Sequence, residues 1–142
     1  MLALLACNQA PSPFEGGWRV TDGGTSLACD GGVFFQPSGN VIVIIDLGGD
    51  LFASIDGAGE EFAVNGDTAS RVGQGVLYLT ADGGYSDTSG SSSTLTLDSD
   101  TLTVKGKTLI EHASGVELDY PYSPTSGSCL FNRTLTATRD PP

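Results

Sequence analysis

Apolar and polar residues alternate at a spacing of two along almost every segment of this chain. The segment 17–22 places Trp18 and Val20 on one face and Arg19 and Thr21 on the other, and 129–139 follows the same pattern. This spacing is typical of β-strands with one buried face, and no segment keeps the helical spacing over ten residues. The sequence therefore predicts an all-β fold.

Turn-forming residues divide the chain into about eight to ten short strands, the number and spacing of an antiparallel barrel or sandwich. Asn65-Gly66-Asp67 predicts one tight hairpin. The segment 94–104 predicts a second hairpin, with its turn at Asp98-Ser99-Asp100. We expect a single domain over 14–139, without substantial helix.

One stretch, VIVII, is apolar at every position. A strand buried on both faces has this composition, and so does a strand with an exposed apolar strip that docks a partner or a second copy. Both interpretations remain open from the sequence. The candidate binding strip comprises Val41, Ile42, Val43, Ile44 and Ile45.

The chain is acidic, with 142 residues, 6 Lys+Arg against 17 Asp+Glu and a net charge of -11. Phosphate groups are bound by Lys and Arg, so this composition argues against nucleic-acid binding and against electrostatic docking on anionic lipid. We interpret the acidity as a solubility feature. No run approaches the roughly 18 apolar residues of a membrane-spanning helix.

Residue types that carry catalysis are sparse. His112 is the single histidine, and no Gly-x-Ser-x-Gly motif is present. Calcium is the most plausible metal, but its candidate ligands form no recognised loop. Those ligands are Asp46, Asp50, Asp98 and Asp100. We therefore expect a non-enzymatic protein without a cofactor or metal.

The N-terminus resembles a targeting signal. Leu4-Leu5-Ala6-Cys7 resembles the box that ends a bacterial lipoprotein signal. On this interpretation residues 1–6 are a truncated signal segment, Cys7 carries lipid, 7–13 form an extended linker and 140–142 a tail. The alternative is an apolar N-terminus that packs on the domain or frays.

The remaining cysteines, Cys29 and Cys129, form an even pair if Cys7 is lipidated. An exported domain with two cysteines is expected to join them in a disulfide. Two free buried thiols in a cytosolic protein are the alternative.

Two family resemblances follow from these motifs. Nearly the whole chain resembles small bacterial lipoproteins of unknown function, through a lipobox, a first strand of the form F-x-G-x-W-x-V, a Cys in the next strand and paired Thr-Leu strands. The last strand resembles C-x-F-x-x-T-L-T-x-T-R. These elements are Phe14, Gly16 or Gly17, Trp18, Val20, Cys29, 94–104 and 129–139.

The second resemblance is to the calycin group, which includes the lipocalins. Gly16-Gly17-Trp18 resembles its first-strand Gly-x-Trp. In that group an Arg of the last strand packs over the Trp, so the resemblance implies that Arg133 or Arg139 closes the barrel through a cation–π contact. Without the resemblance, Trp18 is equally an ordinary core residue.

Two function classes remain open. The chain is expected to be a lipid-anchored envelope protein, attached to the outer membrane and facing the periplasm or the surface. In the first class it binds a protein partner, an envelope component or a small apolar ligand. In the second it is a structural subunit that self-associates through 41–45 and has no ligand.

Overall fold

The computed structural model describes residues 12–27, 32–35, 40–55, 60–73, 75–79, 85–86, 94–118 and 128–140. These residues form eleven β-strands and include no helix that could cross a bilayer. The strands are β1 (Gly16–Leu27), β2 (Gly32–Phe35), β3 (Val41–Asp46), β4 (Asp50–Ala53), β5 (Glu60–Asn65), β6 (Thr68–Arg71), β7 (Gly75–Leu79), β8 (Tyr85–Ser86), β9 (Thr94–Lys105), β10 (Thr108–Leu118) and β11 (Ser128–Arg139).

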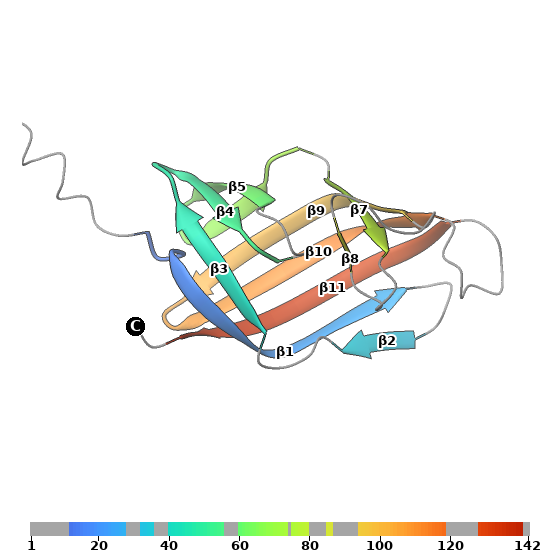
Figure 1. The fold of residues 1–142 in the computed structure, drawn as a ribbon, viewed down its shortest axis with the longest axis horizontal. Coiled ribbons are helices and arrows are strands. Elements are labelled where there is room, and N and C mark those ends of the chain that lie inside the picture. Colours follow the sequence, from blue (N-terminus) through green and yellow to red (C-terminus); the bar gives the residue numbers. More distant parts are fainter. Residues whose placement is uncertain are drawn as a thin grey trace, which may run out of the picture.

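Eight strands close into an antiparallel barrel, which confirms the predicted fold class. Their order is β1-β3-β4-β5-β6-β9-β10-β11, and β11 pairs back with β1. Figure 1 shows β9, β10 and β11 as long ribbons that cross the whole molecule. These strands have 12, 11 and 12 residues and are longer than the short strands expected from the sequence.

β1 and β9 each change partner along their length. The first part of β1 pairs with β3 and the last part with β2. Residues 101–103 of β9 pair with β6, while 94–97 pair with β7. The ring of eight strands is therefore complete at one end, where β1 begins and β11 ends. We call this the closed end (Figure 1).

Two apolar clusters fill the interior. The closed-end core consists of Phe14, Trp18, Val20, Ile42, Ile44, Leu51, Ala53, Phe62, Ala69, Leu102, Val104, Leu109, Leu135 and Ala137. The second cluster consists of Leu77, Leu95, Leu97, Ala113, Cys129 and Phe131. β9, β10 and β11 contribute to both clusters because they are long enough to place inward-facing residues in each.

The hairpin predicted within 94–104 is wrong. The chain does not turn at 98–100 but continues as β9, whose hairpin partner is β10. Asp98 and Ser99 are consecutive exposed residues at a register shift, and the inward alternation resumes at Asp100. A β-bulge accommodates such an extra residue. It explains why the leucines on both sides of the break face the interior.

The hairpin predicted at 65–67 is confirmed. It joins β5 to β6, and Asn65 pairs with Thr68. Gly66 has a φ of 67°, a left-handed conformation that glycine adopts without steric cost.

Candidate functional site

The closed end is sealed by Trp18. Its side chain is fully buried, and its residue lies opposite Arg139 in the pairing of β1 with β11. The Arg139 Cζ atom is 4.3 Å from the centroid of the Trp18 ring. Of the two arginines expected at this ring, Arg139 is therefore the one that stacks on it. Gly16 leaves room for this contact, since a Cβ atom there would lie 2.9 Å from Arg139 Nη1.

The same two side chains hold the chain that precedes β1. The Trp18 indole N–H donates a hydrogen bond of 2.8 Å to the carbonyl oxygen of Phe14. The Arg139 guanidinium donates to the carbonyl oxygens of Pro13 and Glu15. The Phe14 side chain is fully buried in the closed-end core. Residues 13–15 are therefore fastened to the barrel, and we call them the strap.

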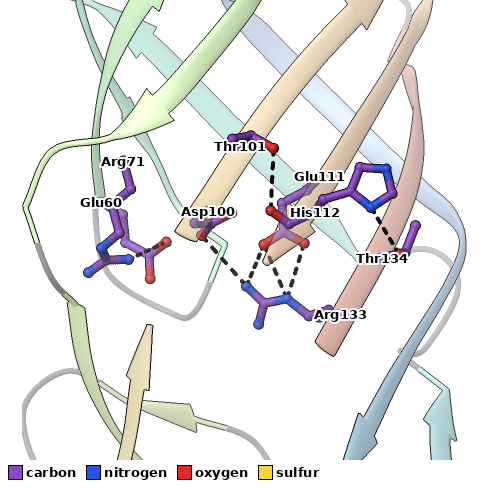
Figure 2. A network of polar contacts seen from close by, with 8 residues as sticks. All are labelled: Glu60, Arg71, Asp100, Thr101, Glu111, His112, Arg133 and Thr134. Atoms are coloured by element: carbon purple, nitrogen blue, oxygen red, sulfur yellow. Dashed lines mark hydrogen bonds and ion pairs between the residues drawn. The ribbon is translucent and has the colours of Figure 1, made fainter. Parts of the chain in front are cut away.

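A layer of charged side chains separates the two apolar clusters (Figure 2). On β9, Asp100 lies between Leu97 and Leu102 among the inward positions. β10 and β11 each place one charged residue at the same level, Glu111 and Arg133. Buried charges carry a large desolvation cost unless they are paired. We call Asp100, Glu111, Arg133, Glu60 and Arg71 the charged layer.

Arg133 is the centre of this layer. Its Nη2 atom is 2.7 Å from Glu111 Oε1, and its Nε atom is 3.1 Å from Glu111 Oε2, so the pair is bidentate. Arg133 Nη2 also lies 4.0 Å from Asp100 Oδ2. The Arg133 guanidinium sits 5.8 Å from the Phe131 ring centroid. Arg133 therefore does not close the barrel over Trp18 but binds the interior carboxyl groups.

The interior environment favours the protonated form of the Asp100 carboxyl. Burial disfavours its charged form, and the neighbouring Glu111 carboxylate repels it, so that its pKa is raised to about 10 despite Arg133. Glu60 adds a smaller repulsion. The proton leaves a neutral carboxyl beside a charged Glu111–Arg133 pair.

Glu60 and Arg71 complete the layer on β5 and β6. Arg71 Nη1 is 3.1 Å from Glu60 Oε2, and the Glu60 side chain is 3% exposed. The Arg71 guanidinium lies over Gly75, where a Cβ atom would approach it to 2.5 Å. With Asp100 neutral, the two carboxylates of the charged layer match its two guanidinium groups.

The outer face of β3 presents an apolar strip. Val41, Val43 and Ile45 are 41%, 48% and 49% exposed, whereas Ile42 and Ile44 are buried in the closed-end core. The interpretation in which both faces of this strand are buried is therefore wrong. The candidate strip divides into a core set and a surface set, as strand alternation requires.

The other residues singled out from the sequence are dispersed. Cys7 and Cys29 lie outside the described residues, and Cys129 is buried in the second cluster. His112 is exposed, and its Nδ1 atom lies 3.1 Å from Thr134 Oγ1. Within the described ranges, no group of three His, Cys, Asp or Glu residues is placed to hold a metal ion.

Sequence reasoning missed the charged layer, because it interpreted the acidic residues as a solubility feature. The signal for Glu111 was present. It follows Leu109 by two positions in a strand-like segment, and period-two alternation puts both side chains on one face. Arg133 likewise shares the buried face of Phe131. Asp100 could not be found in this way, because the bulge at Asp98 changes the phase of the alternation.

The interior and the surface of the barrel thus offer different chemistry. Inside, Arg133 and Arg71 pair with the carboxyl groups of Glu111 and Glu60, and Glu117 is buried as well. Outside, β3 offers an apolar contact surface. No protein-family model, curated protein or solved structure matches this chain.

Proposed function

We propose that this chain is a lipid-anchored protein of the bacterial envelope that acts by non-catalytic binding, with the outer face of β3 contacting a protein partner. The exposure of Val41, Val43 and Ile45, in a strand whose other face fills the core, carries the proposal. Apolar surface left in water forgoes about 25 cal/mol per Å². A partner that covers the strip recovers this free energy.

The geometry of β3 sets the mode of contact. β3 is hydrogen-bonded to β1 on one side and to β4 on the other, so a partner cannot add a strand to it. Gly17 lies opposite Val43, and the half-buried Phe52 lies opposite Ile45. Phe52 therefore extends the apolar surface onto β4, whereas on β1 the Asp140 side chain lies beside Gly17. The partner therefore packs face to face on the barrel wall.

A surface partner is favoured over a ligand inside the closed end. Trp18, Phe14 and Phe62 are fully buried there and occupy the interior with their own side chains. Ligand pockets, by contrast, are concave and largely pre-formed.

A second copy of the chain is the alternative partner. Asp50 is exposed beside the strip, and Asp46 and Glu61 are partly exposed. Two copies with a net charge of -11 each repel one another. A different protein with basic residues around an apolar patch is complementary to this surface.

Site-specific photo-crosslinking in cells tests the contact. A photo-reactive amino acid at position 43 is expected to give a heteromeric adduct, and one at Leu130, which is 62% exposed on β11, is not. A homodimer as the sole adduct at position 43 would favour the self-associating alternative. Equal adducts at both positions, or none, would contradict a β3 contact.

The anchor is tested separately. A protein expressed from its native start is expected to partition with membranes and to show acylation of Cys7 by mass spectrometry. Cys7→Ala is expected to release it. Equal membrane binding of the variant would contradict the lipid anchor.

A further inference from the structure

The strap fixes where the tether leaves the domain. Arg139 holds the Pro13 and Glu15 carbonyl oxygens, and Trp18 holds that of Phe14. All of these contacts lie at the closed end. The chain is consequently held to the barrel from Pro13 onward, and we call the stretch from Cys7 to Pro13 the tether.

This tether is short compared with the barrel. Pro13 follows Cys7 by six residues, and a fully extended chain spans at most about 3.6 Å per residue, or roughly 22 Å. β11 has 12 residues, and at about 3.3 Å per residue it is roughly 40 Å long. A lipid on Cys7 therefore keeps the closed end near the bilayer, while the far end of β11 lies beyond the reach of the tether.

The side chains of the closed end suit a lipid headgroup surface. The chain has 6 Lys and Arg residues. Arg71 and Arg133 belong to the charged layer, and the other four lie at or near the closed end. Lys105 and Lys107 flank the β9–β10 turn and are exposed, and the Lys107 carbonyl oxygen accepts a hydrogen bond from the Arg139 backbone N–H. Lysine side chains are well suited to the interface between water and lipid.

The β3–β4 turn adds an apolar side chain at this end. Leu47 in this turn is 65% exposed. Ile44, three residues before Leu47, lies opposite Gly16 at the start of β1, so the turn is at the closed end. Acidic residues are also present, and Arg19 is paired with Asp140 at 3.0 Å. The closed end is therefore mixed in charge. The tether imposes the orientation, and the two lysines and Leu47 are compatible with it.

We propose that the closed end of the barrel faces the bilayer, with the turns at 47–49 and 105–107 against the lipid headgroups. This inference rests on the proposed lipid anchor at Cys7. In this orientation the exposed strip of β3 begins near the bilayer and extends away from it.

Paramagnetic broadening in nanodiscs tests the orientation. A complete lipoprotein signal is placed ahead of Cys7, so that Cys7 is lipidated even if the native start does not direct lipidation. Mass spectrometry verifies the lipid on Cys7. The lipidated protein is inserted into nanodiscs of phosphatidylethanolamine and phosphatidylglycerol with a spin label on the headgroup. The amides of Gly48 and Gly106 are expected to broaden several-fold more than those of Thr96 and Leu130. Equal broadening at both ends, or stronger broadening at the far end, would overturn the proposal.

Two variants outside the core test whether the tether or the lysine side chains orient the barrel. Ten Gly/Ser residues inserted between Ala10 and Pro11 add a flexible segment of roughly 18 Å, and they are expected to remove most of the difference between the ends. Lys105→Gln with Lys107→Gln, at the same end but outside the strap, is expected to preserve it. The opposite pattern would overturn the tether argument. Unlipidated Cys7→Ala protein is expected to show no broadening, and broadening of it would show lipid affinity independent of the tether and overturn the proposal.

Discussion

Arg139 and Trp18 lie directly opposite each other on β11 and β1, and the guanidinium of one covers the indole of the other at 4.3 Å. The two residues belong to the last and the first strand of the chain. Their contact therefore closes the barrel ring and holds the strap in place. The ring of Trp18 is the largest fully buried side chain of the described part.

Trp18→Ala is expected to destabilise the domain by about 3–5 kcal/mol, as large truncations in a core do. Trp18→Phe retains an aromatic ring but loses the hydrogen bond to the Phe14 carbonyl oxygen. The loss of that bond is expected to contribute about 1 kcal/mol to the destabilisation of this variant. Urea denaturation monitored by circular dichroism measures both. Leu130→Ala, at an exposed position, is the control and should change stability by less than about 0.5 kcal/mol.

Arg133→Met is expected to cost about 3–5 kcal/mol, because it leaves the Glu111 carboxylate buried without its bidentate partner. Arg133→Met combined with Glu111→Leu should recover most of that loss, since neither charge then remains. A double-mutant cycle in urea gives the coupling free energy. Arg19→Met removes an exposed ion pair and should cost at most about 1 kcal/mol. Additive effects of the two interior substitutions would contradict the pairing.

Asp100→Asn is expected to make stability less dependent on pH. Burial and the Glu111 carboxylate raise the pKa of Asp100 in the folded protein to about 10 from its ordinary value of 3.8, so the folded state keeps a proton that the unfolded state releases. Between its unfolded and folded pKa values, Asp100 therefore lowers the free energy of unfolding as the pH rises, by at most about 1.4 kcal/mol per pH unit. Asn cannot ionise, so the variant should gain stability relative to the wild type from pH 5 to pH 9.

Unfolding curves of both proteins across that range measure the difference. Infrared spectroscopy provides an independent check, because the carbonyl band of a buried protonated carboxyl group should be present in the wild type and absent from Asp100→Asn. Parallel pH profiles of the two proteins would show that Asp100 is already ionised at neutral pH.

Ile44 and Ile45 form a matched pair for testing the surface. Ile44 is 1% exposed and Ile45 is 49% exposed in the same strand. Ile44→Thr buries a hydroxyl in place of apolar atoms and should cost about 2–4 kcal/mol. Ile45→Thr retains strand propensity and should cost less than about 0.5 kcal/mol. Similar losses in dilute monomer would place both residues in the core and remove the contact surface.

A disulfide between Cys29 and Cys129 remains a prediction. Leu27, the last described residue before Cys29, pairs with Phe131, and Cys129 precedes Phe131 by two residues in β11. Thiol titration of the unlipidated, unfolded and unreduced protein should find one free thiol, that of Cys7. Three free thiols would exclude the bridge.

The barrel could be predicted because its strands obey a simple physical rule. Trp18 with Val20, and Cys129 with Phe131, alternate with polar residues because one side of each strand meets the core and the other meets water. The glycine at 66 similarly marks its turn through its backbone freedom. Such signals are local, so a single sequence carries them.

The charged layer and the exposed strip depend on information that is not local. Whether Val43 or Ile44 faces outward depends on the neighbouring strands, since both side chains are apolar. The Glu111–Arg133 pair joins residues 22 positions apart, and their contact follows from the register of β10 with β11. The inward position of Asp100 follows from a bulge, which composition does not reveal.

The charged layer also divides the protein dynamically. β3, β4, β5 and β6 contribute only to the closed-end core among the described clusters, whereas β7 contributes Leu77 to the second cluster. Each group can therefore detach from the long central strands without exposing the apolar cluster of the other. Amide hydrogen exchange should resolve two sub-global opening reactions with different free energies. The slowest-exchanging amides should lie on β10 and β11, which cross the boundary and belong to both cooperative units.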